Sequence, residues 1–90
     1  MADQKMLSVQ VVSRTDVLWD GKAAMVSVPS VDGQLGILPG RQPVIAALGR
    51  GTMTIKGSDD QSHEVQVSGG FVSLDSDHVT VVMDNDTMDA

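Results

Sequence analysis

Two short runs of alternating residues decide the fold of this chain. They read Thr52-Met53-Thr54-Ile55-Lys56 and His63-Glu64-Val65-Gln66-Val67, and the polar segment Gly57-Ser58-Asp59-Asp60 lies between them. Apolar and polar side chains that alternate along a β-strand point to opposite faces, so each run predicts a strand with one buried and one solvated face. The polar segment predicts the loop of an antiparallel hairpin.

The same pattern continues on both sides of this hairpin. Strands are predicted at residues 7–11, 17–19, 24–29, 35–38, 44–48, 71–74 and 79–83. Turns are predicted at Asp20-Gly21, Val31-Asp32-Gly33, Pro39-Gly40 and Asp75-Ser76-Asp77. The run from Val44 to Leu48 is apolar almost throughout, which predicts burial on both faces or a crossing between sheets. The short spacing of strands and turns is typical of a sandwich or barrel.

The composition supports an all-β domain. Valine dominates the apolar residues, and nine glycines and three prolines interrupt the chain at short intervals, a combination that favours strands and turns over helices. We expect a flattened β-sandwich or barrel of about nine to ten short strands over residues 6–84. A flexible N-terminus is expected at residues 1–5 and an acidic tail at residues 85–90.

Length and charge exclude several classes of protein. The 90 residues suit one small domain with a thin core. Twelve acidic and six basic residues give a formal net charge of −6, which disfavours nucleic acid and anionic membrane surfaces as partners. The absence of cysteine excludes disulfides and thiolate metal sites. No apolar run approaches the ~20 residues that cross a bilayer, and residues 1–5 lack the order of a signal peptide, so no direct membrane insertion is expected.

Catalytic and metal-binding patterns are weak in this chain. No G-x-S-x-G is present, and the glycines of Gly49-Arg50-Gly51 and Ser68-Gly69-Gly70 lack the Lys-Ser/Thr of a phosphate loop, so they predict turns or bulges. The D-x-D-H pattern at Asp75, Asp77 and His78 predicts a polar turn whose aspartates bond their own backbone. The acidic residues Asp84, Asp86 and Asp89 lack the glycine and the final glutamate of a calcium loop. His63 is expected to be half-exposed. We therefore expect no catalytic residue, no metal site and no cofactor.

One segment has an unusual physical character. It reads Gly33-Gln34-Leu35-Gly36-Ile37-Leu38-Pro39-Gly40-Arg41-Gln42-Pro43-Val44. Proline after a strand fixes the direction in which the chain leaves, and a glycine inside a strand, here Gly36, predicts a bulge or a close backbone approach. The segment is interpreted either as a rigid corner between two sheets or as a preformed edge that meets another protein.

This segment resembles the G-E-L-G-I-L-P-G-H-x-P-L signature of the epsilon subunit of F-type ATP synthases. Three further motifs agree with the same family: Trp19-Asp20-Gly21 at the end of its first hairpin, Val67-Ser68-Gly69-Gly70-Phe71, and Val79-Thr80-Val81-Val82-Met83-Asp84. The resemblance covers about residues 6–84, in the order and spacing of the family. It implies a ten-stranded β-sandwich at the foot of the rotary central stalk.

The resemblance also implies partners and a role. The family's β-sandwich packs on the gamma subunit and on the polar loops of the ring of c subunits, and it couples proton-driven rotation to ATP synthesis without being catalytic. The expected location is the cytoplasmic face of the bacterial plasma membrane, as a peripheral subunit. Carried over residue by residue, the edge that binds gamma and the c-ring comprises Asp32, Gly33, Gln34, Leu35, Gly36, Ile37, Leu38, Pro39, Gly40, Arg41 and Pro43.

The chain departs from the family's pattern at three points. Gln34 stands where the family often has glutamate, with Asp32 as a nearby acid, and Arg41 stands where it often has histidine. The ~40–50 residues of a C-terminal helical hairpin do not follow Asp84, since six residues cannot form it. Inhibition of hydrolysis by such a hairpin and binding of ATP are therefore not expected of this chain.

Two other functions remain open from the residues. One is a free-standing β-sandwich module that binds a sugar or peptide, although Trp19 and Phe71 are the only aromatic residues and both are interpreted as core or hairpin residues. The other is a small metal-assisted hydrolase at Asp75, Asp77 and His78.

Overall fold

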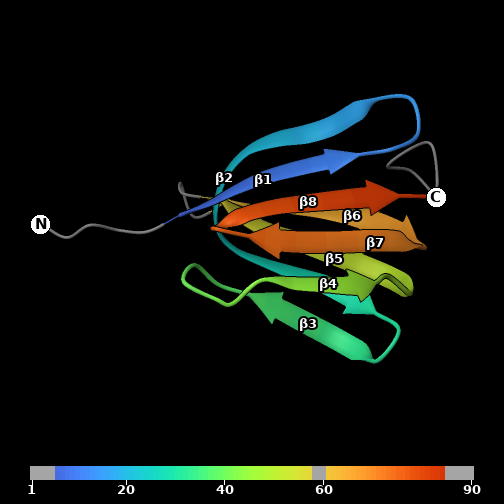
Figure 1. The fold of residues 1–90 in the computed structure, drawn as a ribbon. Helices are drawn as coiled ribbons and strands as arrows, with labels where there is room; N and C mark the ends of the chain where they lie inside the picture. The colour runs from blue at the N-terminus through green and yellow to red at the C-terminus, as the bar shows by residue number, and fades with distance from the viewer. Residues whose placement is uncertain (1–5, 58–60, 85–90) are drawn as a thin grey trace, which may run out of the picture.

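The computed structural model describes residues 6–57 and 61–84, and these residues form eight β-strands (Figure 1). The strands are β1 (Leu7–Val12), β2 (Val17–Ser30), β3 (Gly33–Ile37), β4 (Val44–Ala47), β5 (Arg50–Gly57), β6 (Ser62–Ser68), β7 (Gly70–Asp75) and β8 (His78–Met83). The predicted all-β class is confirmed. The described part of the chain contains no helix long and apolar enough to cross a membrane.

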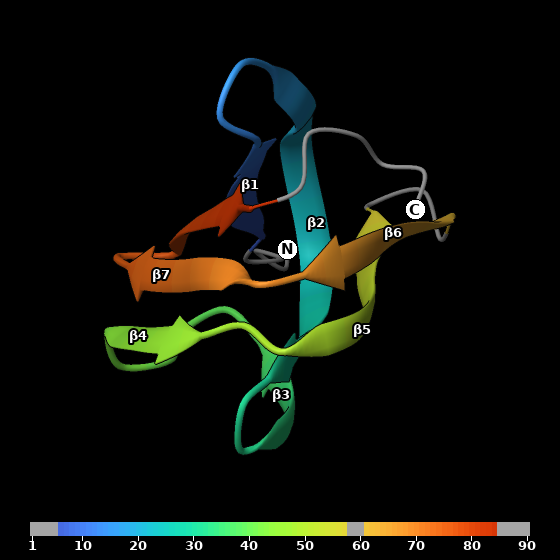
Figure 2. The same ribbon diagram turned by 90° about the vertical axis from the view of Figure 1, so that its right-hand side faces the viewer.

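The strands form one continuous sheet that folds over into two layers. The hydrogen-bonded order is β4-β7-β8-β1-β2-β5-β6, and β3 pairs with β2. The 14 residues of β2 belong to both layers, because its first half pairs with β1 and its second half pairs with β3 and β5. Figure 2 shows β2 running through the molecule with β4 and β7 on one side and β5 and β6 on the other. We call the two layers the β1 layer, which contains β4, β7, β8, β1 and the first half of β2, and the β5 layer, which contains β3, β5, β6 and the second half of β2.

Side chains from both layers fill the space between them. Fully buried residues come from alternate positions, such as Val9 and Val11 of β1 and Met53 and Ile55 of β5. The alternation predicted for residues 52–56 and 63–67 is therefore confirmed, with Val65 and Val67 buried on β6. The core holds aliphatic side chains and methionines, and the partly buried Trp19 packs against it.

The predicted turn at Asp20-Gly21 is wrong. Both residues lie inside β2, where Asp20 pairs with Gln10 and Gly21 with Val9 of β1, and the turn between these strands is formed by Ser13–Asp16 instead. The indole of Trp19 explains the glycine, because a Cβ on Gly21 would lie 3.1 Å from the ring. An aromatic side chain over a strand glycine covers the backbone that the glycine exposes. Two predicted strands therefore merge into one, so residues 6–57 and 61–84 form eight strands where about nine to ten were expected.

The edge strand β4 departs from the prediction in part. Val44 and Ala46 pack against the core, but Ile45 is 77% exposed, so the strand is not buried on both faces. The predicted crossing lies directly after it, because the chain leaves the β1 layer at Leu48 and enters the β5 layer at Arg50. An apolar strand at a sheet edge leaves one face without a partner inside the chain.

A second crossing lies beside the first and requires glycine. The chain returns from β6 to β7 through Gly69 and Gly70, and the carbonyl of Gly70 accepts a hydrogen bond from the amide of Leu48 at 2.9 Å. Gly70 has φ +121°, and a Cβ there would overlap the carbonyl oxygen of Val82. The glycines predicted to form a turn or bulge form a bend between β6 and β7, and glycine is needed there because two backbones approach closely.

We predict that Gly70→Ala lowers the free energy of unfolding by about 3 kcal/mol or more, because the substitution combines a strained φ with a backbone clash. Urea unfolding followed by the fluorescence of Trp19 measures the change. Gly36→Ala is the matched control. Gly36 lies in a regular part of β3 with nothing within 4 Å of its Cβ position, so its substitution should change stability by less than about 1 kcal/mol. Equal effects of the two substitutions would contradict the role given to Gly70.

Candidate functional site

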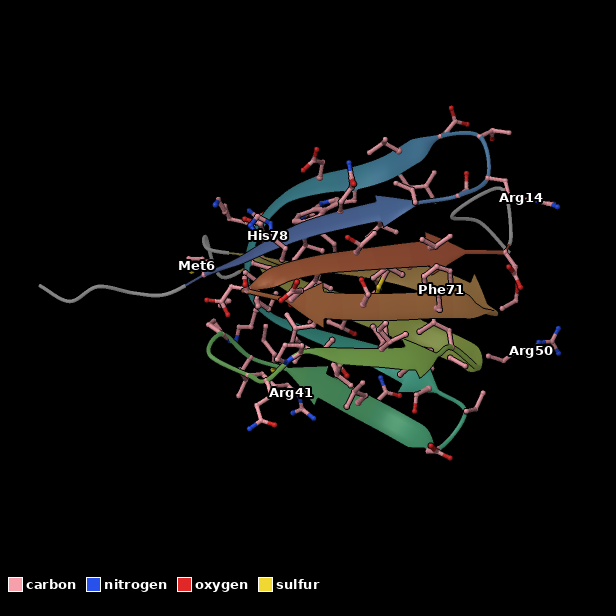
Figure 3. The ribbon with its side chains drawn as sticks, in the orientation of Figure 1. Met6, Arg14, Arg41, Arg50, Phe71 and His78 are labelled. Carbon is pink, nitrogen blue, oxygen red and sulfur yellow. The ribbon has the colours of Figure 1, made fainter. Side chains whose placement is uncertain are left out.

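The segment from Asp32 to Pro43 spans the length of the molecule. Asp32 lies in the turn before β3, at the end that carries Arg14 and Arg50, and the chain then follows β3 to the opposite end, which carries Met6 and His78 (Figures 1 and 3). The predicted residues therefore form one edge of the β5 layer and not a compact patch. Ile37 of this set is fully buried, whereas Asp32, Gly33, Gln34, Gly36, Leu38, Gly40, Arg41 and Pro43 are exposed.

Local hydrogen bonds fix the start of this edge. The hydroxyl of Ser30 donates to the carbonyl of Gly33 at 2.6 Å and accepts from the amide of Asp32 at 3.2 Å. Gly33 has φ +122°, which a residue with a side chain rarely adopts. The predicted turn at residues 31–33 is confirmed, and its tip presents Val31 and Asp32 to solvent.

The middle of the edge is held by two side chains that lie over the strands. The amide of Gln34 donates to the hydroxyl of Ser27 at 2.9 Å, across the outer face of the β5 layer. The guanidinium of Arg41 reaches back to the carbonyl of Gly36, at 3.4 Å. The predicted bulge or close approach at Gly36 is wrong, because the pairing of β3 with β2 is regular and the Cβ position is open. Gln34 and Arg41 thus share this edge.

The end of the edge is a loop tied to another part of the chain. The amide of Gly40 donates to a carboxylate oxygen of Asp77, in the turn between β7 and β8, at 2.8 Å. Pro43 and Ile45 then line an open groove of about 660 Å³ with Val44, Ser73, Leu74 and Asp75. The loop therefore has a defined position although its residues Leu38, Arg41 and Pro43 are exposed.

The turn at residues 75–77 is confirmed, but its bonding differs from the prediction. The carboxylate of Asp77 bonds the distant amide of Gly40 rather than its own turn. His78 pairs with Ser8 of β1. Among the described residues, no three histidine, cysteine or acidic side chains gather as metal ligands. Asp86 and Asp89 lie outside the described residues. His63 is half-buried against Trp19, with ring centroids 5.6 Å apart, close to the half-exposed position expected for it.

A second surface was not predicted as a site. On the outer face of the β1 layer, apolar side chains stand opposite one another in register across five strands. We call this set the apolar row; it comprises Ala47 of β4, Phe71 of β7, Val82 of β8, Val12 of β1 and Val17 of β2. Phe71 is 46% and Val17 57% exposed. Of the two interpretations of Phe71, the core residue is therefore wrong, whereas the hairpin residue is confirmed by its place in the β7–β8 hairpin. The neighbouring row is polar apart from Ile45, with Ser73, Thr80, Gln10 and Asp20.

A sequence signal for the apolar row exists. Alternation stops at the ends of two strands, in Val11-Val12 and in Val81-Val82-Met83, where residues of both faces are apolar. Because β1 and β8 are parallel and in register, these two ends lie side by side. The sequence alone does not give that pairing, so the two irregularities have no evident connection until the strands are placed.

The charges of the described surface are mixed. Residues 6–57 and 61–84 include seven acidic and five basic residues, so most of the net negative charge belongs to residues outside them. The apolar row itself contains no charged side chain. The described surface therefore offers one uncharged row on a sheet face and one polar edge, and neither is a strongly acidic patch.

A family model and individual relatives in other organisms point to the same family. Residues 6–87 match the family model described as "ATP synthase, Delta/Epsilon chain, beta-sandwich domain". An ATP synthase epsilon chain of Micrococcus luteus is 40% identical over 75 residues, which are 83% of this chain and 82% of the relative. An epsilon chain of Corynebacterium diphtheriae is 39% identical over 91% of this chain but only 65% of the relative. This chain thus spans most of the first relative and about two thirds of the second.

Two solved structures share the fold. A chain of the Euglena gracilis mitochondrial ATP synthase, in a structure described as OSCP/F1/c-ring, superposes with a TM-score of 0.85 at 14% identity, covering 93% of this chain and 54% of that chain. A chain of the Tetrahymena thermophila mitochondrial enzyme, in a structure described as central stalk/c-ring, gives a TM-score of 0.76 at 11% identity, covering 93% of this chain and 67% of that chain. At these identities the likeness establishes the β-sandwich architecture.

We predict that Ser30→Ala destabilises the chain by about 1 kcal/mol, because both hydrogen bonds that shape the turn before β3 are lost. Amide exchange of Asp32 should rise together with the loss of stability, as measured by NMR. Val31→Ala is the control, since that side chain is 67% exposed and should contribute little. Unchanged exchange at Asp32 in Ser30→Ala would show that the hydroxyl does not hold the turn.

Proposed function

The chain belongs to the ATP synthase delta/epsilon-chain family, and on that premise we propose that it is a non-catalytic rotor subunit of the central stalk of a proton-transporting ATP synthase. In this role it docks on the gamma subunit and on the c-ring, and it couples proton-driven rotation to ATP synthesis. The bacterial relatives favour the cytoplasmic face of the plasma membrane, where the chain would be a peripheral subunit of the complex. Hairpin-based inhibition of hydrolysis is not part of this proposal.

The apolar row is the observation that carries the docking proposal. Contiguous apolar side chains on a monomer's surface are typical of sites that another protein covers. Phe71 lies in the row between Ala47 and Val82, and an aromatic residue flanked by smaller apolar residues is typical of an interface core. We assign the apolar row to the gamma subunit, because an uncharged apolar surface suits a permanent contact better than a contact with polar loops.

The edge from Asp32 to Pro43 is assigned to the c-ring. Its exposed residues include Asp32, Gln34 and Arg41, which can hydrogen-bond or pair with the polar loops of a ring. Their contribution is to fix orientation more than to supply affinity, since exposed charge pairs are weak. Arg41 carries a permanent charge, whereas the histidine often found in the family is mostly neutral at pH 7.

The placement of the two surfaces suits a coupling element. The apolar row lies on the outer face of the β1 layer and the 32–43 edge belongs to the β5 layer, so both partners can bind at the same time. The strand β2 runs through both layers without interruption. A displacement imposed on one surface is therefore transmitted to the other through a hydrogen-bonded body with no linker between them.

A free-standing β-sandwich module that binds a sugar or peptide is the alternative. The exposure of Phe71 favours it in one respect, because an aromatic ring can stack on a sugar. The neighbours of Phe71 in the row are aliphatic, however, and sugar recognition also needs polar groups close to the ring. Specific binding on a glycan or peptide array, with no binding to gamma, would support this alternative and contradict the rotor proposal.

We predict that Phe71→Ser weakens binding to the purified gamma subunit by at least about tenfold, the size expected for the loss of an aromatic residue at the centre of an interface. The measurement is a titration of labelled chain with gamma. Leu38→Ser is the matched control, because Leu38 is 56% exposed on the other surface and should leave gamma binding unchanged. Equal binding by wild type and Phe71→Ser would refute the assignment of the apolar row to gamma.

A crosslinking experiment tests the second surface. Single cysteines introduced at Gln34 and at Arg41 are expected to crosslink to c subunits in the assembled enzyme, and a cysteine at Phe71 to gamma. The chain has no cysteine of its own, so each crosslink reports one position. Crosslinks from Gln34 and Arg41 to gamma alone would overturn the assignment of this edge to the ring.

Loss of the chain should uncouple the enzyme. We expect reconstituted ATP synthase without this subunit to lose most of its proton-driven ATP synthesis, and addition of the wild-type chain to restore it. Proton uptake and ATP formation are measured together in vesicles. Synthesis that is the same with and without the chain would show that it is not a coupling subunit.

A further inference from the structure

Asp77 connects three parts of the chain at one end of the molecule. Its carboxylate accepts the amide proton of Gly40 at 2.8 Å, in the loop between β3 and β4. Its backbone carbonyl accepts the amide proton of Ser8, at the start of β1, at 2.8 Å. Its own position is the turn between β7 and β8. Gly40 and Asp77 are 37 residues apart, so the side-chain bond is a tertiary contact.

The backbone at Asp77 is adapted to this contact. Asp77 has φ +64° and its neighbour Ser76 has φ +52°, both in the left-handed region that side chains rarely adopt. Aspartate and asparagine are the non-glycine residues that tolerate this region best. Glycine is the residue that most easily adopts this left-handed conformation. The chain has Asp77 there instead, and its carboxylate accepts a hydrogen bond from the amide of Gly40.

The bond to Gly40 acts on the proposed docking edge. Gly40 has φ +86° and comes directly before Arg41, whose guanidinium lies against the carbonyl of Gly36 on the exposed side of β3. A hydrogen bond that holds the backbone at Gly40 therefore also holds the backbone of Arg41, from which the guanidinium extends to the carbonyl of Gly36. A carbonyl at the free edge of a sheet is open to pairing with other chains, and a charged side chain over it limits such pairing.

We infer that Asp77 is a positioning residue, which holds the loop of Leu38–Arg41 in the conformation that the c-ring recognises. The inference rests on the proposed function for the identity of the partner. Asp77 itself is half-buried beneath the loop and is not assigned a contact with the partner. Asp77 reduces the number of conformations of the free loop, so that the loop loses less conformational entropy when it binds.

Two substitutions separate the hydrogen bond from the backbone conformation. Asp77→Gly keeps the left-handed φ and removes the acceptor, and it should accelerate amide exchange at Gly40 by about fivefold or more, as expected for the loss of one hydrogen bond. The same substitution should weaken binding to the isolated c-ring by a comparable factor. Asp77→Asn keeps both an acceptor oxygen and a side chain that tolerates this φ, so it should behave as wild type in both measurements.

Ser76→Gly is the matched control. It introduces a glycine at the neighbouring left-handed position and leaves the contact with Gly40 in place. It should change neither Gly40 exchange nor ring binding, and exchange at the core residue Val81 should remain as in wild type in all three variants. A general loss of stability would instead raise exchange at Val81 as well.

The outcomes distinguish this inference from the proposed function. If Gly40 exchange in Asp77→Gly equals that of wild type, the bond does not hold the loop and the inference is overturned. If exchange rises but ring binding is unchanged, the loop is not positioned for the ring and the inference is also overturned. If the wild-type chain does not bind the ring, the proposed partner is wrong and the docking role of Asp77 is lost with it, while Gly40 exchange still decides whether the bond orders the loop.

Discussion

The approach of two backbones at Gly70 and Val82 is the constraint on which the two-layer arrangement depends. Two of the crossings between the layers, after β4 and after β6, are hydrogen-bonded to each other through Leu48 and Gly70. A side chain at Gly70 would overlap the carbonyl of Val82 and push β7 away from β8. The same contact lies beside the apolar row. Phe71 directly follows Gly70 in the chain, and it stands opposite Val82 in the row. Closure of the sandwich and presentation of the row therefore depend on one contact.

The sequence predicted the parts of the fold that are determined locally. Residues 52–56 and 63–67 form strands with the expected buried faces, because alternation is a property of each strand alone. The turns at residues 31–33 and 75–77 follow from glycine, aspartate and serine for the same reason. Asp20-Gly21 has the same turn composition but lies inside β2, since the pairing of β2 with β1 and the indole of Trp19 outweigh the local preference. Only tertiary structure supplies these two contacts.

One of the two candidate surfaces could be singled out from the sequence, and its binding role stays a prediction. The edge from Asp32 to Pro43 follows from its unusual glycines and prolines and from its resemblance to the family, and the structure places its residues along one side of the β5 layer. The apolar row and the contact between Asp77 and Gly40 could not be predicted, because each joins residues that are distant in sequence. Their residues look ordinary when each strand is considered alone: a valine that interrupts alternation and an aspartate in a polar turn. Strand register is the missing information in both cases.

The parallel pairing of β1 with β8 has a mechanical consequence. These are the first and last strands of the described chain, and because they run in the same direction, Met6 and Asp84 emerge at opposite ends of the sandwich. Tension between these two points would pull β1 and β8 in opposite directions along their own axes. Under this shear the hydrogen bonds between the two strands must break together, whereas strands that are unzipped from one end lose their bonds one after another. The pair therefore resists as a unit. A small β-sandwich with a thin core can in this way withstand a pulling force without a larger core.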